Sequence, residues 1–401
     1  MVPEGWSITK LSDLADVKRG AGSQYLTYVD EPDEGIRLIR IGDFLGDNPK
    51  FVSHTSDMDR FILKKDDILI AGTGATAGIT FEVPEHFEGY AFSYNAPRIR
   101  PKKHVDKVFL VNFLKSNEIT KQQRSLFTGN AQPFLDTKAI GGFKILTPPL
   151  PEQQKIADIL STWDAAIEKT EALLATAKAQ KRALMQSLLT GKRRFPEFEG
   201  QPWKEVRLGD VFSRVRRRNT VGNDNVLTIS AQHGLVSQEK YFNKRVAAKD
   251  LSGYTLLHHG DFAYNKSYSR GYPLGAIKML EIDEPGVVSS LYLCFALTDK
   301  SSNCREYFRH FFEAGRFNHE IYKIAQEGAR NHGLLNVSST DFFRAQVSVP
   351  PLAEQRKIAA VLNCAEDQIA EHAQSVEKLR TEKKALMQQL LTGKRRVVVD
   401  A

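Results

Sequence analysis

The sequence has few of the features that mark several common classes of protein. It contains three cysteines, Cys294, Cys304 and Cys364. Their odd number and their spacing match no disulfide framework or zinc site, which favours a reducing, cytoplasmic setting. No run approaches the roughly 18 apolar residues of a membrane-spanning helix. The start of the chain, MVPEGWSITK, lacks the basic stretch and apolar run of a signal peptide.

Catalytic signatures are also missing. The glycine-rich segment 72–78, GTGATAG, has no Lys-Ser/Thr pair of a phosphate-binding loop, and we expect a turn between strands there. No Asn-Pro-Pro-aromatic or Asp-Pro-Pro-Tyr tetrapeptide is present for gripping a flipped adenine, and no carboxylate–lysine cluster suggests a nuclease. His258 and His259 precede Gly-Asp and indicate a turn rather than a metal site. The sequence therefore predicts no catalytic residue and no metal ligand.

What the chain does have is length and positive charge. Its 401 residues are too many for one ordinary core and predict two or more domains. The formal net charge is +8, which favours a polyanionic partner because lysine and arginine release counterions from phosphates. Many basic proteins bind no nucleic acid, so the charge alone does not decide the class of partner.

The most informative feature is an internal repeat. Residues 148–194 (PPLPEQQKIADIL…KRALMQSLLTGKRR) align without a gap with residues 350–396 (PPLAEQRKIAAVL…KKALMQQLLTGKRR), at an offset of 202, and 22 of the 47 positions are identical. The preceding segments resemble each other more faintly, with Trp6 against Trp203 and Leu11 against Leu208. The period is too long for a solenoid, so the chain is a duplicated half-protein.

The repeat divides the chain into globule, helix, globule and helix. We expect mixed α/β globules at 1–147 and 195–349, and helical regions at 148–194 and 350–401. The globules contain short β-rich runs, such as 36–41, 67–72, 226–230, 287–297 and 345–350, and helical stretches at 108–123 and 305–324. Glu152 and Glu354 suit the positive start of a helix. Gly191 and Gly393 suit a left-handed residue just past its end.

Each helical region carries apolar residues at alternating spacings of four and three, the pattern of a coiled coil. We call these residues the seam: Ile156, Leu160, Trp163, Ile167, Leu174, Leu184, Leu188, Ile358, Leu362, Ile369, Val376, Leu379, Leu386 and Leu390. A parallel pair, or separate packing of each helix on its own globule, remains open. A repeat that pairs with itself most simply gives an antiparallel pair. Centred near Ala172 and Gln374, that pair would place Lys383 opposite Trp163 and Lys181 opposite Ala365.

The loops of the globules are the candidate binding sites. Asn, Gln and Arg read base edges in the major groove, while Lys and Arg anchor phosphates. An Arg-rich run at 214–218 and polar loop tips before the last strand of each globule fit this chemistry. The DNA-binding candidates are Arg40, Thr73, Thr76, Asn130, Gln132, Arg216, Arg217, Gln232, His233, Asn265, Lys266, Tyr268, Arg270, Arg330, Asn331 and His332.

The Pro-Pro-Leu-x-Glu-Gln-x-Lys-Ile-Ala element, present twice, and the two LLTGKRR endings resemble the conserved helical regions of Type I restriction–modification specificity subunits. The resemblance covers essentially the whole chain. It implies an α+β, pseudo-two-fold fold with two target-recognition domains and an antiparallel pair of helices. Each domain would read one half of a split DNA site. Two methylation subunits would bind the helices, and restriction subunits would join that core. S-adenosylmethionine, ATP and magnesium would belong to those partners, and no cofactor is expected on this chain.

Two other readings remain. One is a divergent methyltransferase or nuclease, against which the missing tetrapeptides argue. The other is a scaffold that is built on a coiled coil and does not bind DNA. The sequence does not distinguish this scaffold from a DNA-recognition subunit except through the resemblance.

Overall fold

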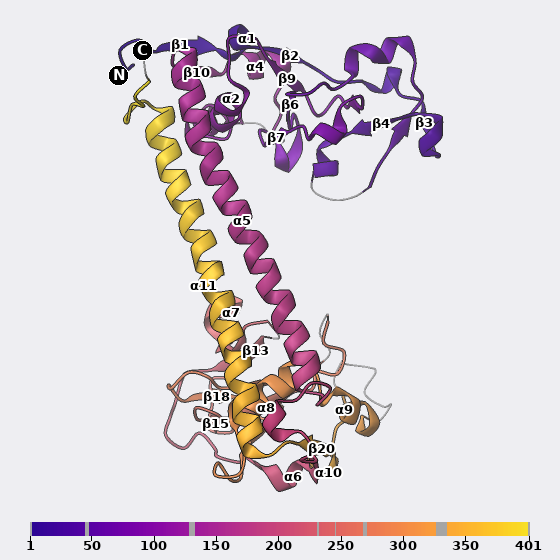
Figure 1. Ribbon diagram of the computed structural model, residues 1–401, viewed down its shortest axis with the longest axis vertical. Helices are drawn as coiled ribbons and strands as arrows, with labels where there is room; N and C mark the ends of the chain where they lie inside the picture. The colour runs from indigo at the N-terminus through magenta and orange to yellow at the C-terminus, as the bar shows by residue number, and fades with distance from the viewer. Residues whose placement is uncertain are drawn as a thin grey trace. The chain divides into compact units, whose positions relative to one another are not determined.

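The structure is a computed structural model, and it describes residues 2–44, 48–127, 133–230, 232–244, 246–267, 271–325 and 335–399. The chain forms two compact units (Figure 1). Unit 1 consists of residues 1–172 and 374–401, and unit 2 of residues 173–373. The division passes through both long helices, α5 (Leu150–Leu188) and α11 (Leu352–Leu391). Each unit therefore combines a globular part with one end of each long helix.

The described residues of unit 1 form two four-stranded sheets and one strand pair. One sheet has the strand order β2-β9-β6-β7 and is antiparallel; the other has the order β3-β5-β4-β8, with β4 and β8 parallel. The strand pair joins β1 to β10. The elements of its globular part are β1 (Ser7–Lys10), α1 (Leu11–Leu14), β2 (Ala15–Lys18), η1 (Ser23–Tyr25), β3 (Tyr28–Val29), η2 (Pro32–Glu34), β4 (Ile36–Ile39), η3 (Ile41–Phe44), β5 (Phe51–Val52), η4 (Ser56–Phe61), β6 (Ile68–Ile70), η5 (Gly74–Thr76), β7 (Thr80–Glu82), η6 (Glu85–Phe87), β8 (Ala91–Phe92), β9 (Arg98–Pro101), α2 (Lys107–Leu114), α3 (Asn117–Phe127), α4 (Thr137–Gly141) and β10 (Lys144–Thr147).

Unit 2 repeats part of this plan. Its four-stranded antiparallel sheet has the order β12-β19-β16-β17, and a strand pair joins β11 to β20. Two further antiparallel pairs, β13-β14 and β15-β18, stand in place of the second sheet of unit 1. The elements of its globular part are η7 (Pro196–Phe198), β11 (Lys204–Arg207), α6 (Leu208–Val211), β12 (Phe212–Arg214), β13 (Leu227–Ser230), β14 (Gly234–Ser237), α7 (Gln238–Phe242), β15 (Thr255–Leu257), β16 (Phe262–Asn265), β17 (Ala276–Met279), β18 (Gly286–Val288), β19 (Leu293–Leu297), α8 (Arg305–Glu313), α9 (Asn318–Ile324), α10 (Ser339–Arg344) and β20 (Gln346–Val349).

Three stretches that the sequence presents as single elements are each two elements. The apolar run 287–297 divides into the end of β18 and β19, which pair with different strands. The helical stretch 108–123 divides into α2 and α3, and the stretch 305–324 into α8 and α9. Asp106 caps the start of α2, where its carboxylate accepts a 2.8 Å hydrogen bond from the Phe109 amide. Segment 72–78 is a turn between β6 and β7, as expected.

The two long helices run antiparallel within each unit. In unit 1 the start of α5 packs against the end of α11, where Ile156, Leu160 and Leu390 share one core. In unit 2 the end of α5 packs against the start of α11, and the shared core contains Leu188 and Leu362. Among the remaining seam positions, Ile358 and Val376 are buried. The half-buried ones are Trp163, Ile167, Leu174, Leu184, Ile369, Leu379 and Leu386.

Ion pairs beside the seam report its register. Lys383 Nζ lies 2.5 Å from a carboxylate oxygen of Asp164, the neighbour of Trp163. Lys181 Nζ lies 2.6 Å from a carboxylate oxygen of Glu366, the neighbour of Ala365. Both lysines thus lie beside the residues that the antiparallel register assigns to them.

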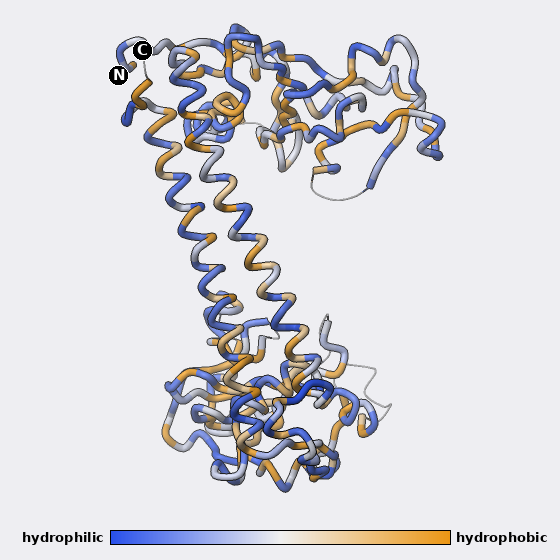
Figure 2. The backbone as a smooth tube through the Cα atoms, in the orientation of Figure 1, coloured by the Kyte–Doolittle hydropathy of each residue, from blue (hydrophilic) through white to orange (hydrophobic). Residues whose placement is uncertain are grey.

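The fold is α+β, with two mixed globular parts and two long helices. A glycine of positive φ follows the end of each long helix, with 69° at Gly191 after α5 and 66° at Gly393 after α11. Along both helices hydrophobic residues recur between hydrophilic ones (Figure 2). Among the described residues, no helix combines the length and the apolar character that crossing a membrane requires.

Candidate nucleic-acid interface

In each unit a hairpin loop meets the segment that precedes a short helix. In unit 1 the β6–β7 loop is held by a 2.8 Å hydrogen bond from the Leu135 amide to the Gly72 carbonyl. In unit 2 the chain that follows β16 is held in the same way, by a 3.0 Å bond from the Leu335 amide to the Lys266 carbonyl. Thr73 bridges to Phe134 and Thr76 ends η5, so both threonine candidates lie on the unit 1 loop. The framework of the loops is therefore alike in the two units, although their sequences differ.

One arginine at this loop cluster was not among the sequence candidates. Arg19 follows β2, and its guanidinium lies 4.2 Å from the ring centre of Tyr94 and 5.2 Å from that of Phe134. Arg19 also donates a 2.7 Å hydrogen bond to the Tyr94 hydroxyl. Tyr94 lies 75 residues after Arg19 in the chain and Phe134 lies further on, so no local sequence signal links them.

The structure gives several candidates a role in folding. Arg217 donates to the Asp261 carboxylate and to the Leu256 carbonyl. Burial raises the pKa of Asp261, against the hydrogen bonds and charges that lower it. Arg40 donates to the Asn48 carbonyl at 2.5 Å. Arg40 and Arg217 therefore hold loops in place. An arginine in a loop of the sequence can thus serve the fold as well as a ligand, and its residue type does not tell which.

The remaining described candidates lie in three places. Asn265 accepts a 3.0 Å hydrogen bond from the Ser267 amide, and Lys266 Nζ lies 3.5 Å from the Val337 carbonyl, both beside the unit 2 loop. Arg216 is exposed. Gln232 and His233 lie elsewhere, in a hollow that also includes Arg309 and Glu313. The candidates outside the described residues are Asn130, Gln132, Tyr268, Arg270, Arg330, Asn331 and His332.

The repeated Pro-Pro-Leu-x-Glu-Gln element forms a clamp in unit 1. Glu152 accepts hydrogen bonds from Arg396 at 2.5 and 3.1 Å, and from Trp6 Nε1 at 3.0 Å. The Arg396 guanidinium also lies 5.5 Å from the Trp6 ring centre. The clamp therefore ties the N-terminal segment, the start of α5 and the segment after α11 to one carboxylate.

Unit 2 contains the same clamp with a different set of residues. Glu354 accepts hydrogen bonds from Arg194 at 2.6 and 2.9 Å, and from Trp203 Nε1 at 3.1 Å. The Arg194 guanidinium lies 5.9 Å from the Trp203 ring centre. A bidentate guanidinium–carboxylate pair is a strong, directional contact. The identical Glu and Arg residues of the repeat are thus explained by their pairing within each unit.

The glutamine of the same element binds the start of one globular helix in each unit, α2 in unit 1 and α8 in unit 2. Gln153 accepts from the Asp106 amide at 3.0 Å and donates to the Pro148 carbonyl at 2.9 Å. Gln355 accepts from the Cys304 amide at 2.8 Å and donates to the Pro350 carbonyl at 2.9 Å. Asp106 and Cys304 are the caps of α2 and α8, so the two helices occupy equivalent places on their long helices.

A polar network docks α8 onto the helix pair of unit 2. Among the described residues, His310, Glu313 and Glu366 are the one set of three potential metal ligands whose donor atoms lie within 4.8 Å of one another. Lys181 Nζ lies 3.3 Å from Glu313 and 2.6 Å from Glu366, and Arg309 lies 2.5 Å from Glu366. Two cations thus already neutralise the carboxylates, which makes this an ion-pair network rather than a vacant metal site.

Burial alone would raise the pKa of Glu366, but hydrogen bonds from Arg309 and Lys181 outweigh it and lower that pKa to about 2. Burial, together with the charge of Arg309, lowers the pKa of His310. His310 Nε2 lies 2.8 Å from the Asn363 amide oxygen and 3.1 Å from a terminal nitrogen of Arg309. The joint at α8 is therefore an ion-pair network beside a histidine whose pKa is lowered.

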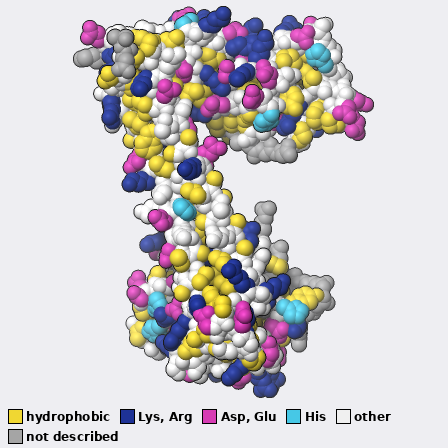
Figure 3. Space-filling view, viewed as in Figure 1, with side chains coloured by type: hydrophobic (Ala, Val, Ile, Leu, Met, Phe, Trp, Pro, Cys, Tyr) yellow, Lys and Arg dark blue, Asp and Glu magenta, His cyan; other side chains and the backbone are white. Residues whose placement is uncertain are grey.

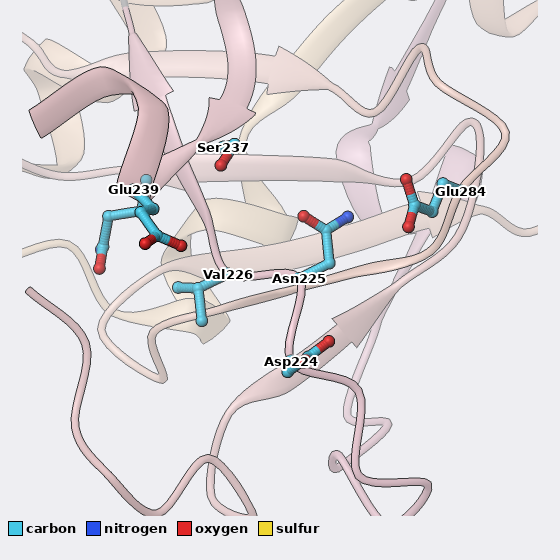
Figure 4. A pocket seen from close by; sticks show the side chains of 7 residues that line it. Asp224, Asn225, Val226, Ser237, Glu239 and Glu284 are labelled. Carbon is cyan, nitrogen blue, oxygen red and sulfur yellow. The ribbon is translucent and has the colours of Figure 1, made fainter. Parts of the chain in front are cut away.

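One further hollow of unit 2, of about 290 Å³, has acidic walls (Figure 4). Carboxylates of Asp224, Glu239 and Glu284 line it. They repel a phosphate backbone, so this part of unit 2 is unsuited to contact nucleic acid. On the face in Figure 3, Lys and Arg are interspersed with Asp and Glu over both units. Net charge therefore does not locate the interface, and the loop clusters are the better candidates.

Comparison with known proteins identifies the class. Residues 3–178 match the family model described as the Type I restriction modification DNA specificity domain. The Type I restriction enzyme MjaVIII specificity subunit of Methanocaldococcus jannaschii is 26% identical and aligns over 99% of this chain and 94% of its own length. The Type I restriction enzyme EcoKI specificity subunit of Escherichia coli is 22% identical over 94% of this chain and 84% of its own length.

Solved structures agree on the fold. The HsdS subunit from Thermoanaerobacter tengcongensis superposes with a TM-score of 0.52 at 19% identity, covering 98% of both chains. The Type-I restriction-modification system S subunit from M. genitalium gives a TM-score of 0.54 at 14% identity, covering 96% of both chains. Residues 3–178 thus match the DNA specificity domain of Type I restriction–modification systems, and over nearly its whole length the chain is similar to Type I specificity subunits.

Proposed function

We propose that each unit of this chain reads one half of a split DNA site, and that the two long helices set the spacing of the halves. One observation carries this proposal: the two units share their clamps and one four-stranded sheet order but differ in their loops and second sheets. A shared framework with different loops suits two recognition events of different sequence. The names of the similar proteins, specificity subunits of Type I restriction enzymes, support the same role.

The proposal extends to partners and cofactors. The long helices bind two methylation subunits, each of which methylates one adenine in a half-site with S-adenosylmethionine. Restriction subunits join that core and use ATP and magnesium. All of these cofactors lie on the partners. Polar residues outside the seam, spread along both long helices, leave surface for such subunits.

Exchange of residues 1–147 for the corresponding segment of another specificity subunit tests the division of labour. We expect one specific block of the DNA motif to change and the other to remain. Methylated-adenine sequencing of a genome modified by the assembled complex reads both blocks at once. A change in both blocks contradicts the assignment of one half-site to each unit. If DNA binding by the complex is unchanged after the exchange, the alternative is favoured, in which this chain is a scaffold that does not itself recognise DNA.

The helix length tests the spacing role. Half-sites read in the major groove by similarly oriented modules lie about one helical turn apart, roughly 34–36 Å. Four residues inserted within 171–182, matched by four after Ala373, lengthen both helices by roughly 6 Å, which is about two base pairs at 3.4 Å per pair. We expect the unspecified gap to widen by about one or two base pairs, with both specific blocks unchanged.

The matched control replaces four exposed residues of the same segment by alanine without changing its length. That control should keep the original gap. An insertion that alters the specific bases, or a control that alters the gap, contradicts the spacing role.

A further inference from the structure

We infer that Arg19 is a specificity-determining residue that contacts a guanine through its guanidinium, presented by Tyr94 and Phe134. This inference rests on the proposed DNA-recognition function and names one residue of the unit 1 interface. Arg19 is not among the residues that the sequence pattern selects. It is selected by four features of the structure, namely its surroundings, the exposure of its aromatic neighbours, its unused donors and its position beside the loop cluster.

The surroundings of Arg19 fix its direction. Gly20 packs so tightly that an added Cβ would lie 2.3 Å from the Ser93 carbonyl oxygen. The Ala21 amide donates to the Phe92 carbonyl, and the Tyr94 amide donates to the Ala21 carbonyl, both at 2.9 Å. The segment after β2 and the segment that carries Tyr94 are therefore locked together. A guanidinium held by such a pair loses little freedom on binding, which favours directional recognition.

The aromatic neighbours are exposed in a way that folding does not explain. Tyr94 and Phe134 leave 44% and 45% of their surface accessible. Phe134 is held beside the β6–β7 loop through its bridge to Thr73, and the Gly74 amide donates to the Pro133 carbonyl at 3.1 Å. Two large exposed rings on a rigid support, with an arginine against them, are typical of a binding surface.

Arg19 keeps donors for a ligand. Its guanidinium hydrogen-bonds the Tyr94 hydroxyl through one terminal nitrogen. No carboxylate of the described part of the chain forms an ion pair with it, and its Nε is buried without a partner there. The remaining N–H groups on the two terminal nitrogens match the O6 and N7 acceptors of guanine, the commonest specific contact of arginine in the major groove. A phosphate contact would not need a guanidinium held in one plane.

The equivalent residue of unit 2 is held differently. Aligning Leu11 with Leu208 places Arg19 opposite Arg216, which is exposed. Among the described residues, the recorded contacts between a cation and an aromatic ring include Arg19 but not Arg216. Within the described part of the chain, the two arginines therefore differ in aromatic contact at one framework position.

The test uses the complex assembled with its methylation subunits, S-adenosylmethionine and a randomised duplex DNA library. Methylated-adenine sequencing gives the motif of the unaltered complex, and the exchange of residues 1–147 assigns one block to unit 1. We expect Arg19→Ala and Arg19→Lys to relax one guanine position of that block, with discrimination falling roughly 5- to 150-fold. Tyr94→Phe keeps the aromatic ring and leaves the charge of Arg19 in place but removes the hydroxyl. This variant should relax the same guanine position more weakly.

Lys18→Ala is the matched control, because it removes a neighbouring exposed cation and should leave the motif unchanged. An unchanged motif in Arg19→Lys, with reduced methylation in Arg19→Ala, identifies a phosphate contact and overturns the inference. An unchanged motif in both variants overturns it as well.

If Arg19→Ala abolishes methylation, competition binding decides, using duplexes with each base at the guanine position. Equal loss of affinity for all four duplexes overturns the inference, whereas loss confined to the guanine duplex supports it. An unaltered complex without a two-part motif would contradict the proposed function itself, independently of Arg19.

Discussion

The two units attach their globular parts to the long helices with the same clamp but with different contacts one turn further on. In unit 2 the clamp is buried, with 1% of the Glu354 side chain and 17% of the Arg194 side chain exposed. In unit 1 the corresponding values are 11% for Glu152 and 41% for Arg396. The same residues therefore operate in a drier environment in unit 2, where each ionic contact is stronger and more costly to break.

The contacts of α2 and α8 with the long helices differ in kind. Gln153 and Gln355 bind the N-cap residues of α2 and α8, and five residues after these caps unit 1 has Val111 whereas unit 2 has Arg309. Unit 1 thus docks α2 through an apolar side chain, whereas unit 2 docks α8 through an ion-pair network. The residues of the repeat therefore form the attachment that both units share. Residues outside the repeat determine how stable each attachment is and how that stability depends on pH.

The largest expected effect comes from removing the buried carboxylate. Glu354→Ala leaves Arg194 without its partner in a largely buried site, at a cost of about 3–5 kcal/mol. Glu152→Ala should cost about 1–2 kcal/mol, because water reaches Arg396. Urea unfolding followed by tryptophan fluorescence measures both, since Trp203 and Trp6 lie in the two clamps. Equal costs in the two units would mean that burial does not distinguish the clamps.

The ion-pair network gives the α8 joint of unit 2 an acid dependence. The pKa of Glu366 falls from 4.5 to about 2 on folding, so its stabilisation is present above pH 4.5 and is lost as the pH falls toward 2. The loss is at most about 3 kcal/mol. Glu366→Gln should remove this part of the pH dependence in urea or thermal unfolding.

The control for that experiment is Asp164→Asn, at the equivalent position of unit 1. The Asp164 side chain is 56% exposed in its pair with Lys383, so the variant should change stability by no more than a few tenths of a kcal/mol. A similar acid dependence in both variants would contradict the difference between the two joints.

The smallest effect is expected from moving the chain ends. Arg396 donates a 2.9 Å hydrogen bond to the Glu4 carbonyl, just as Arg194 donates to the Gln201 carbonyl in the continuous chain of unit 2. Joining residue 401 to residue 1 and opening the chain between Pro196 and Gly200 should change stability by less than about 1 kcal/mol. Assembly with the methylation subunits and DNA binding should persist. Loss of either would show that the two clamps are not interchangeable.

The sequence predicts the helices well and their contacts poorly. The spacing of apolar residues over 156–188 and 358–390 is local, so it indicates two long helices and their seam. Glu152 and Glu354 were interpreted as favourable charges at a helix start. In the structure each also receives an arginine from beyond the end of the other long helix. That pairing depends on the antiparallel arrangement, which the repeat suggests but does not prove.

The binding surface is harder to predict, for a physical reason. Side-chain chemistry selects the candidate residues, but it does not separate Arg217, which pairs with buried Asp261, from an arginine that is left for a ligand. Arg19 could be recognised only when Tyr94 and Phe134, distant in sequence, were brought beside it by folding. The sequence also does not show the break between β18 and β19, because the run 287–297 is largely apolar. The break follows only from the pairing of the two strands in different sheets.

The discontinuity of unit 1 has a consequence for how the protein is made. Unit 2 is one continuous stretch, residues 173–373, whereas unit 1 also needs residues 374–401. A ribosome delivers the chain from its N-terminus at about 5–20 residues per second, so the first unit begun is the last one finished. Until Leu390 and Arg396 emerge, Leu160 lacks part of its apolar cover and Glu152 lacks its cation. A chain that ended at residue 373 would carry a complete second unit and an incomplete first one, with apolar surface of the first unit left exposed.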